Sequence, residues 1–361
     1  MVNTLLKSPD TLTEQICARF REEIEAGKYA ADDPLPSFGA LADAYKISKS
    51  TVHEAFKTLA AEGFVFIKHG KGAFLNPARV KRRNGRKLAD VALVAFNIFS
   101  ANDNYMIPFL EAVNASALAK KIKLHFNFIR GMSLLSPENS VVREAVAHGQ
   151  YDGLIIASPL EPRDLEWLTT LKVPFVAATS RYAIDVPQVL LDNTLAAKLA
   201  ADIFERRGAK KLAVFTGPLS WEREGVTPYA KEIHDAFSVL KKEKGLNVSM
   251  VSCEYAYSDA REKALDLFSN NGRFDGLFFQ SDIIAKGVMA ALSEKKIDVS
   301  AMTIINYCDL EDYLAPVNIR KPLQAMGREA FALLESVLSG KEIKTPIILK
   351  PQLIEKEKKH G

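Results

Sequence analysis

Residues 35–75 read LPSFGALADAYKISKSTVHEAFKTLAAEGFVFIKHGKGAFL, and this order of apolar and polar side chains predicts two short helices followed by a β-ribbon. Ser37 can cap the first helix, and Lys46-Ile47-Ser48 makes a short turn after it. The second helix is expected from Lys49 to Glu62. Its inward face is formed by Val52, Phe56 and Leu59, which recur at helical spacing.

The residues after the second helix have the pattern of a β-hairpin. Gly63 ends the helix, and Phe64 to Ile67 has the length and apolarity of a strand. His69-Gly70-Lys71-Gly72 is a tight, basic tip before the returning Ala73-Phe74-Leu75. A third helix is expected upstream, because apolar residues recur there at helical spacing. They are Leu12, Ile16, Phe20 and Ile24.

The expected arrangement is two helices joined by a short turn, with polar donors at the start of the second helix. Proteins that place a recognition helix in the major groove of DNA have this arrangement. The donors here are Lys49, Ser50, Thr51 and His53. Taken singly, each piece has an ordinary alternative: helix-turn-helix geometry occurs in bundles that bind nothing, and Ser or Thr at a helix start is usually a cap. Here the cap, the turn and the second helix occur in the right order and are followed by the β-hairpin with its basic tip, which we call the wing. This order favours a DNA-binding N-terminal domain, which we call the head.

Residues 11–77 resemble the winged helix-turn-helix of the gluconate-repressor (GntR) family. The matching pieces are a leading helix ending in IEAGKY, then LPS, LA, ISKSTVHEAFKTLAAEG and HGKGAF. In that family the DNA contacts come from the residue after LP, the start of the recognition helix and the wing tip. The resemblance implies contacts by Ser37, Ser48, Lys49, Ser50, Thr51, His53, His69 and Gly70, with Lys71 adjacent. This chain departs from the family at Gly39 and His53, where the family often has Arg.

The charge distribution divides the chain. Residues 1–87 carry 15 Lys and Arg against 10 Asp and Glu, whereas the remainder carries 33 against 34. The basic excess is densest at 79–87, which contains no acidic residue and is either a solvated linker or a linker that contacts phosphates. We therefore expect a DNA-binding domain at 1–77, a basic linker at 78–88, an effector-binding and dimerisation domain at 89–355 and a charged tail at 356–361.

From Leu88 onward, short apolar strands alternate with helical stretches, which is typical of parallel strands covered on both faces. The expected strands are Val91–Phe96, Ile122–Ile129, Gly153–Ala157, Val173–Ala178, Leu212–Phe215, Val248–Cys253, Leu277–Phe279 and Thr303–Ile305.

Two motifs repeat at nearly one offset. YDGLIIAS at 151–158 recurs as FDGLFFQS at 274–281, and LVAF at 93–96 is echoed by LAVF at 212–215. Because Asp-Gly is a common turn, chance is the alternative explanation. The repetition favours two similar lobes, so the fold class is α/β: a winged helix-turn-helix followed by a bilobed parallel-sheet domain. Ligands bind beyond the carboxyl ends of such strands, so Ser158 and Ser281-Asp282 are expected to face a shared cleft.

The region from 88 to about 354 resembles the effector domain of lactose and galactose repressors, itself similar to periplasmic sugar-binding proteins. VPFVAATSR, VLLDNTLAAKLAADIFERRGAKKLAVFTGP, FDGLFFQSDIIAKGVMAAL and MTIINYCDLEDYLAPVNIRKPLQAMGREAFALL carry the resemblance. By position it implies effector contacts by Asn102, Tyr105, Ser158, Trp221, Asp282 and Asp309, with Arg181 within a residue of a further contact. Tyr229 stands where the family has an Arg, so that donor is missing or is supplied by Arg223.

Carboxylates, amides and aromatic rings suit a sugar, which offers paired hydroxyls and an apolar ring face. Asp309 could instead cap the helix after it, and Tyr105 could belong to the core. Asp192-Asn193 is interpreted as the cap of a helix at 194–206. Together the two resemblances imply a repressor of carbohydrate-utilisation genes that a monosaccharide or derivative releases from an operator in double-stranded DNA.

Enzyme classes find little support, because the chain has no G-x-S-x-G elbow, no H-E-x-x-H motif and no Walker loop. We expect no catalytic residue, metal or cofactor. The alternative is a soluble sugar-binding or sugar-processing protein whose head serves only dimerisation. A homodimer is expected in either case, with the helical face 104–121 available for pairing.

Nothing in the first ten residues resembles a signal peptide, and no apolar run is long enough to span a membrane. The three cysteines, Cys17, Cys253 and Cys308, are scattered and odd in number, which favours reduced thiols. A cytoplasmic protein is therefore expected.

Overall fold

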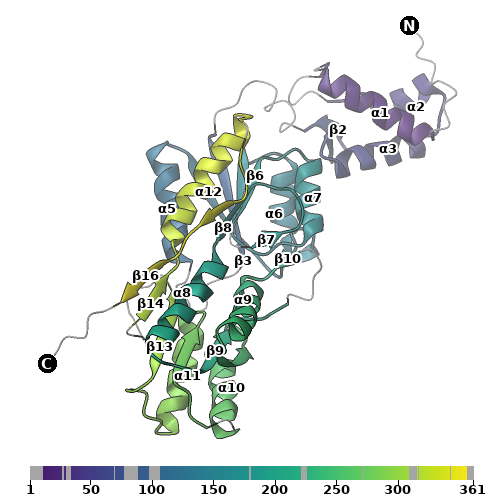
Figure 1. The fold of residues 1–361 in the computed structure, drawn as a ribbon. Coiled ribbons are helices and arrows are strands. Elements are labelled where there is room, and N and C mark those ends of the chain that lie inside the picture. The colour runs from purple at the N-terminus through teal and green to yellow at the C-terminus, as the bar shows by residue number, and fades with distance from the viewer. Residues whose placement is uncertain are drawn as a thin grey trace.

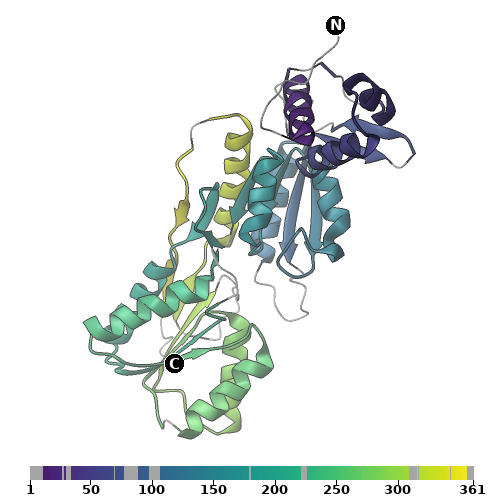
Figure 2. The same cartoon turned by 90° about the vertical axis from the view of Figure 1, so that its right-hand side faces the viewer.

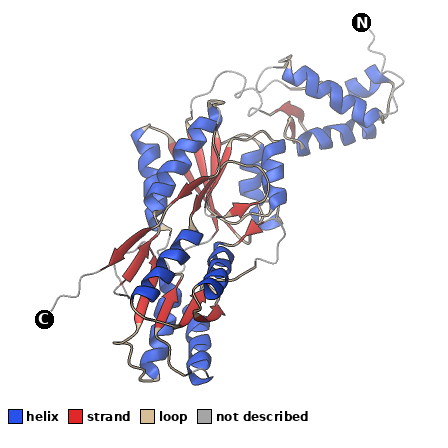
Figure 3. Ribbon diagram, in the orientation of Figure 1, coloured by secondary structure: helices blue, strands red, loops and turns tan. Residues whose placement is uncertain are grey.

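The computed structural model describes residues 11–26, 28–29, 34–68, 70–76, 88–96, 106–178, 180–220, 226–270, 272–308, 315, 317–341 and 343–355. These form a small N-terminal head and two α/β lobes stacked end to end, with the head beside the first lobe (Figure 1). The view turned by a right angle separates the two sheets (Figure 2), and colouring by secondary structure shows helices covering both (Figure 3).

The head has three helices and a two-stranded wing. Its elements are α1 (Leu12–Glu25), α2 (Phe38–Tyr45), α3 (Lys49–Ala61), β1 (Val65–Lys68) and β2 (Gly72–Leu75). The two strands pair antiparallel, with Val65 opposite Leu75. Each helix begins at a side-chain cap: Thr11 forms a capping box with Glu14, while Ser37 and Ser48 accept from the backbone N–H of Ala40 and Thr51.

The predicted core of the head is correct apart from one residue. The side chains of Ile16, Phe20, Ile24, Val52, Phe56 and Leu59 are all buried. Leu12 was expected among them and is 45% exposed, so that expectation is wrong. Leu12 is the first residue of α1. Helical spacing assigns a residue to a face but carries no information on how far the covering helices extend along it.

The first lobe is built on a six-stranded, all-parallel sheet with the order β15-β8-β6-β5-β3-β4. Its elements are β3 (Asp90–Phe96), α5 (Ile107–Ala119), β4 (Lys123–Ile129), η1 (Pro137–Asn139), α6 (Ser140–Ala147), β5 (Gly153–Ile156), α7 (Pro162–Thr170), β6 (Phe175–Ala178), β7 (Arg181–Tyr182), β8 (Gln188–Leu191), α12 (Leu323–Leu338) and β15 (Ile347–Leu349). Of the face expected at 104–121, the structure describes the part that forms α5 and the turn after it.

The second lobe repeats this plan with the order β11-β9-β12-β13-β14-β16, in which β16 runs antiparallel to β14. Its elements are α8 (Asn193–Arg206), β9 (Lys211–Thr216), β10 (Val226–Thr227), α9 (Tyr229–Glu243), β11 (Asn247–Ser252), α10 (Tyr257–Asn270), β12 (Gly276–Phe279), α11 (Asp282–Glu294), β13 (Thr303–Cys308), β14 (Val317–Arg320) and β16 (Gln352–Glu355). The predicted α/β fold class is confirmed. The strands β7, β8, β10, β14, β15 and β16 were not predicted.

The repeated Asp-Gly motif performs the same structural task in both lobes. Asp152 accepts hydrogen bonds from the backbone N–H of Ala89 and Asp90, at 2.8 and 2.9 Å, where β3 begins. Asp275 accepts from the N–H of Lys210 and Lys211, at 3.0 and 2.8 Å, where β9 begins. Asp152, which precedes β5, therefore fixes the start of the neighbouring strand β3. Asp275, which precedes β12, fixes the start of β9 in the same way. The repeat reflects duplicated architecture at the amino ends of the strands, away from the carboxyl ends where ligands bind.

The described chain crosses between the lobes three times. It passes from β8 to α8 at Asp192, from β14 to α12 at Lys321-Pro322, and from β15 to β16 at Lys350-Pro351. The short strands β7 and β10 also pair across the lobes, with Arg181 opposite Thr227. These crossings lie at one end of each sheet, so they position the polar residues described below.

Candidate functional site

The start of α3 carries a small network of hydroxyl groups. Ser48 caps the helix: its Oγ accepts from Thr51 N–H at 3.0 Å, and it lies 2.6 Å from Ser50 Oγ and 2.8 Å from Thr51 Oγ1. Ser48, Lys49 and Ser50 are exposed, and Thr51 is half-buried. Capping fixes the direction of the helix, and the shared hydroxyls hold several donors and acceptors at its tip. This is the part of a recognition helix that reaches base edges.

Ser37 and Lys49 are brought close together by the turn between α2 and α3. Ser37 caps α2 and is exposed, with its Oγ 3.1 Å from Ala40 N. Lys49 lies against Gly39: its Cε would be 3.5 Å from a Cβ placed on that glycine. That distance is an ordinary van der Waals contact, so the Lys49 side chain packs beside the start of α2. His53 is half-buried, with its ring edge-on to Phe38 at 5.5 Å between centroids.

The wing tip contains two glycines with left-handed backbone, Gly70 at φ 71° and Gly72 at φ 94°. A β-carbon is disfavoured in this region, so the tight turn depends on glycine at both positions. Lys71 stands exposed between them. His69 lies outside the described residues.

Of the predicted effector contacts, Asn102, Tyr105, Trp221 and Asp309 lie outside the described residues. Ser158 follows β5 and is buried, with its carbonyl oxygen accepting from Tyr182 Oη at 3.2 Å. Asp282 is the first residue of α11 and accepts from Asn306 Nδ2 at 2.6 Å. Arg181 lies in β7 and forms an ion pair with Glu232 of α9.

A chain of hydrogen bonds runs from Arg181 into the second lobe. Arg181 donates to one oxygen of Glu232, and the other oxygen accepts from Asn193 Nδ2 at 2.7 Å. Asn193 Oδ1 in turn accepts from Tyr307 Oη at 3.0 Å. Asn193 begins α8 directly after a crossing, and Tyr307 belongs to β13. The network therefore connects both lobes to one of the segments that joins them.

Lys321, at the crossing from β14 to α12, has no exposed surface. Its Nζ donates to the carbonyl oxygen of Gln280 at 2.9 Å. It also lies over the rings of Tyr307 and Tyr229, at 4.5 and 5.6 Å from their centroids. A buried ammonium group needs such polar and aromatic contacts to replace water.

Three buried polar atoms near the carboxyl ends of neighbouring strands have no hydrogen-bond partner among the described residues. They are Thr216 Oγ1, Ser281 Oγ and Asn306 Oδ1. These residues end β9, follow β12 and lie in β13, and those three strands are adjacent in the sheet. Unmet hydrogen-bonding capacity beside buried amides, a cation and tyrosine rings is suited to a polar, hydroxyl-rich molecule.

Arg181, Ser158 and Asp282 were predicted as effector contacts and lie among the described residues. The sequence did not single out Glu232, Asn193, Lys321 or Gln280 as site residues. Lys321 had only a weak signal: it is the second residue of the pair Arg320-Lys321, between the stretch Val317-Asn318-Ile319 and Pro322. Glu232 had none, because it lies on an amphipathic helix among other exposed charges. The expected cap by Asp192 is confirmed, its carboxylate accepting from Leu195 N–H at 2.8 Å.

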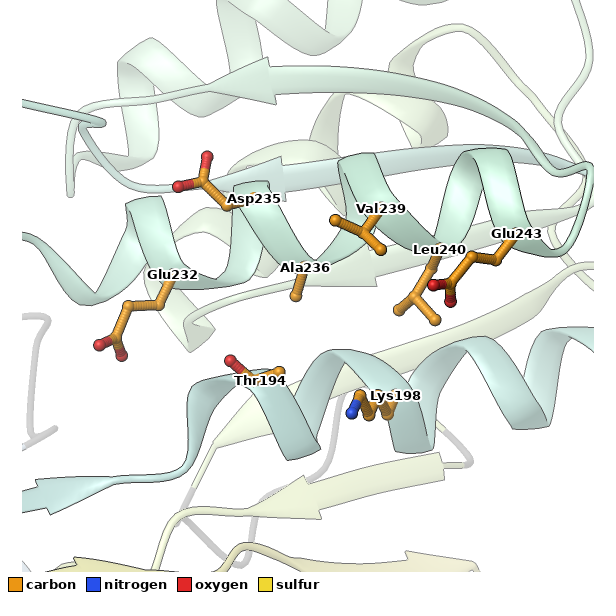
Figure 4. A pocket seen from close by; sticks show the side chains of 8 residues that line it. All are labelled: Thr194, Lys198, Glu232, Asp235, Ala236, Val239, Leu240 and Glu243. Carbon is orange, nitrogen blue, oxygen red and sulfur yellow. The ribbon is translucent and has the colours of Figure 1, made fainter.

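A groove of about 470 Å³ runs between α8 and α9 (Figure 4). Thr194 and Lys198 contribute from α8, and the α9 side is formed by Glu232, Asp235, Ala236, Val239, Leu240 and Glu243. It meets the interlobe network only at Glu232, and its lining includes none of the predicted effector residues that the structure describes. We assign the candidate site to the strand ends, because the unmet hydrogen-bonding groups are there.

Within the described parts of the chain, no group of three or more His, Cys, Asp or Glu is placed to hold a metal ion. No helix among them is long and apolar enough to cross a membrane. The three cysteines are buried, and none of them forms a disulfide. Burial raises the pKa of the Cys253 thiol to about 12.

Two family models match the chain, one in each part. Residues 12–75 match the bacterial regulatory proteins of the gntR family, and residues 201–357 match a periplasmic binding protein-like domain. Both resemblances inferred from the sequence are thereby confirmed.

Curated relatives match one part or the other. A ribose operon repressor of Halalkalibacterium halodurans is 25% identical over 209 residues, which is 56% of this chain and 60% of the relative. The Exu regulon transcriptional regulator of Escherichia coli K12 is 36% identical over 67 residues, covering 19% of this chain and 26% of the relative. The chain thus spans less than two thirds of the length of each.

Among solved structures, a lac repressor dimer bound to operator aligns with a TM-score of 0.64 at 15% identity. The alignment covers 76% of this chain and 96% of that one. At this identity the likeness establishes the fold of the two lobes.

Proposed function

Because the chain joins a gntR-type regulatory head to a periplasmic-binding-protein-like domain, we propose that it is a sequence-specific transcriptional regulator. It represses carbohydrate-utilisation genes and is released from its operator by a small sugar. The observation that carries this proposal is the exposed start of α3, with its hydroxyl groups and Lys49, on a chain whose second lobe has unmet polar groups at its strand ends. The chain acts as a regulator and not as an enzyme, and it works in the cytoplasm, where the chromosome is.

The head reads DNA through two kinds of contact. The start of α3 enters the major groove, where Lys49, Ser50, Thr51 and His53 meet base edges. Ser37 and Ser48 hold the phosphate backbone and the register. His69, Gly70 and Lys71 reach the adjacent minor groove or backbone. Residues 1–77 form the DNA-binding unit, 78–88 the linker and 89–355 the effector unit.

The effector binds between the lobes. Ser158 and Arg181 contribute from the first lobe and Asp282 from the second, and Asn102, Tyr105, Trp221 and Asp309 complete the set. The aromatic members cover the sugar ring, while carboxylates and amides bond its hydroxyls. Closure of the lobes changes the spacing of two heads held by a homodimer. The difference in effector affinity between closed and open states supplies the free energy for release.

A gel shift with fragments of the source chromosome tests the DNA half of the proposal. We expect one or a few fragments to be retarded at salt that abolishes binding to bulk DNA, with a near-palindromic site in each. A chain that retards every fragment equally, or none, is not a sequence-specific regulator. The head would then serve dimerisation in a sugar-binding protein.

A thermal-shift screen of pentoses, hexoses and their phosphates tests the effector half. A ligand that binds only the folded state raises the melting temperature by mass action. The same compound should release the retarded fragment. A compound that stabilises the protein but leaves the gel shift unchanged would separate sugar binding from regulation.

A further inference from the structure

The head is joined to the first lobe through a buried amide. Asn76 follows β2 and is 2% exposed, and its Nδ2 donates to the carbonyl oxygen of Gly63 at 2.9 Å inside the head. The same nitrogen donates to the carbonyl oxygen of Ala147, the last residue of α6 in the first lobe. The last four carbonyl oxygens of an α-helix receive no hydrogen bond from an N–H group of the same helix. Asn76 therefore supplies a donor to the end of α6 from a different domain.

Two apolar contacts surround this bond. The Gly63 α-carbon faces Leu171, the residue that ends α7: a Cβ on Gly63 would lie 2.1 Å from Leu171 Cδ2. The Phe66 ring of β1 lies 5.3 Å from the His148 ring, between centroids, at the end of α6. Figure 1 shows the head beside α6 and α7 of the first lobe, as these contacts require. A directional hydrogen bond, a packed methyl group and a ring contact together select one orientation of the head.

The contact lies at the far end of the recognition helix from the DNA-reading residues. Gly63 follows the carboxyl end of α3, whereas Ser48 and Lys49 are at its amino end. A helix of 13 residues is about 20 Å long, at 1.5 Å per residue. Ser48, Lys49 and Ser50 remain exposed while the head is in contact with the lobe. The contact thus leaves the amino end of α3 accessible.

We propose that the turn between α3 and β1, together with Asn76, is a docking surface for the ends of α6 and α7. The head and the first lobe then move as one rigid body. If the proposed regulatory function holds, any displacement of the first lobe on closure displaces α3 directly, without having to pass through the segment between Asn76 and Leu88.

Pulsed electron paramagnetic resonance on the full chain tests the docking without operator or sugar. Spin labels are placed on Lys57→Cys in α3 and Glu166→Cys in α7, both exposed positions, while the three native thiols are buried. A docked head gives a single narrow distance distribution. A broad distribution in the otherwise unchanged chain means that the head moves freely, which overturns the proposal.

Three variants in the labelled chain locate the cause. Asn76→Asp keeps the side-chain shape but replaces the donor with a carboxylate facing two carbonyls, so the narrow peak should be lost. His148→Ala removes the ring contact from the lobe side and should broaden the peak. Gln150→Ala, an exposed neighbour of His148, should leave it unchanged.

A narrow peak that neither Asn76→Asp nor His148→Ala broadens would show that something other than this contact fixes the head, and the proposal would be rejected. Asn76 also bonds Gly63 inside the head, so circular dichroism must first show that the Asn76→Asp variant folds. If that variant does not fold, the width of the distance distribution in His148→Ala alone tests the proposal. The regulatory proposal can fail in its gel shift while this test succeeds, so the two failures are distinguishable.

Discussion

Arg181 of the first lobe forms an ion pair with Glu232 of the second, and Glu232 also accepts a hydrogen bond from Asn193 at the start of α8. The side chain of Arg181 is 39% exposed and that of Glu232 is 16% exposed. Arg181 was predicted as an effector contact, yet here its charge is directed at a carboxylate of the opposite lobe. The pair therefore joins the two lobes directly.

We expect the Arg181–Glu232 pair to couple more strongly than an ion pair on the surface of one helix. A double-mutant cycle with Arg181→Gln and Glu232→Gln should give a coupling free energy of about 1 kcal/mol in urea unfolding. The matched control is Lys231–Asp235 on the same α9, with both side chains about half exposed, for which about 0.3–0.5 kcal/mol is expected. Equal couplings in the two cycles would contradict the expectation that the interlobe pair is the stronger one.

Substitutions in the head should separate base reading from phosphate binding. His53→Ala should cost about 1–3 kcal/mol at the operator and relax sequence preference, because His53 is at the start of α3. Lys71→Ala should weaken binding to all DNA similarly and reduce the dependence of affinity on salt, since Lys71 is at the exposed wing tip. Gel shifts over a range of salt concentrations measure both. Unchanged operator affinity in both variants would rule out the head assignment.

Asp309→Ala should bind operator normally but lose the response to the sugar. A carboxylate that bonds the effector only when the lobes are closed provides part of the coupling free energy, typically about 1–3 kcal/mol in total. The measurement is a titration of operator release with the sugar found by thermal shift. A response at unchanged potency would place the effector elsewhere.

The two Asp-Gly carboxylates should differ in their contribution to stability despite identical bonding. Asp152 is buried, and Asp152→Ala leaves two N–H groups without an acceptor, which should cost about 1–3 kcal/mol of unfolding free energy. Asp275 is exposed, so water can replace its carboxylate and Asp275→Ala should cost less. Urea unfolding at neutral pH compares them, and a larger loss for Asp275→Ala would contradict the argument.

The Asp275 contribution should also depend on pH. Hydrogen bonds from Lys211 and Lys210 N–H lower the pKa of Asp275. Its charged form is therefore favoured in the folded state, and the contribution is full above the unfolded pKa, about 3.9. The contribution is lost as pH falls through the lower, folded-state pKa. The difference between Asp275→Ala and the unchanged chain should accordingly shrink in acid.

Glycine-to-alanine substitutions should have opposite effects at two helix positions. A Cβ on Gly327 of α12 would lie 2.5 Å from the carbonyl oxygen of Phe109 in α5, and a backbone atom has little room to move. Gly327→Ala should therefore destabilise the first lobe by about 1–3 kcal/mol. A Cβ on Gly39 of α2 meets nothing closer than 3.5 Å, so Gly39→Ala should stabilise by about 0.5–1 kcal/mol. Thermal unfolding distinguishes the signs.

The sequence alone determined the elements whose signals are local. The spacing of Val52, Phe56 and Leu59 predicts a helix with one buried face, and that helix forms. Ser37 and Asp192 act as caps because a cap involves residues within one turn of the chain. The Asp-Gly repeat predicted two similar lobes for the same reason, since each copy marks the same short connection between a turn and a strand.

Only the tertiary structure decided which distant residues meet. Glu232 is 51 residues from Arg181, and Asn76 is 71 from Ala147. Nothing in the periodicity around these residues specifies the partner. Such contacts depend on where the chain crosses between lobes and where the head rests, and these are set by packing over the whole molecule. The burial of Lys321 and the exposure of Leu12 have the same origin, because a sequence pattern predicts the face of an element but not what covers it.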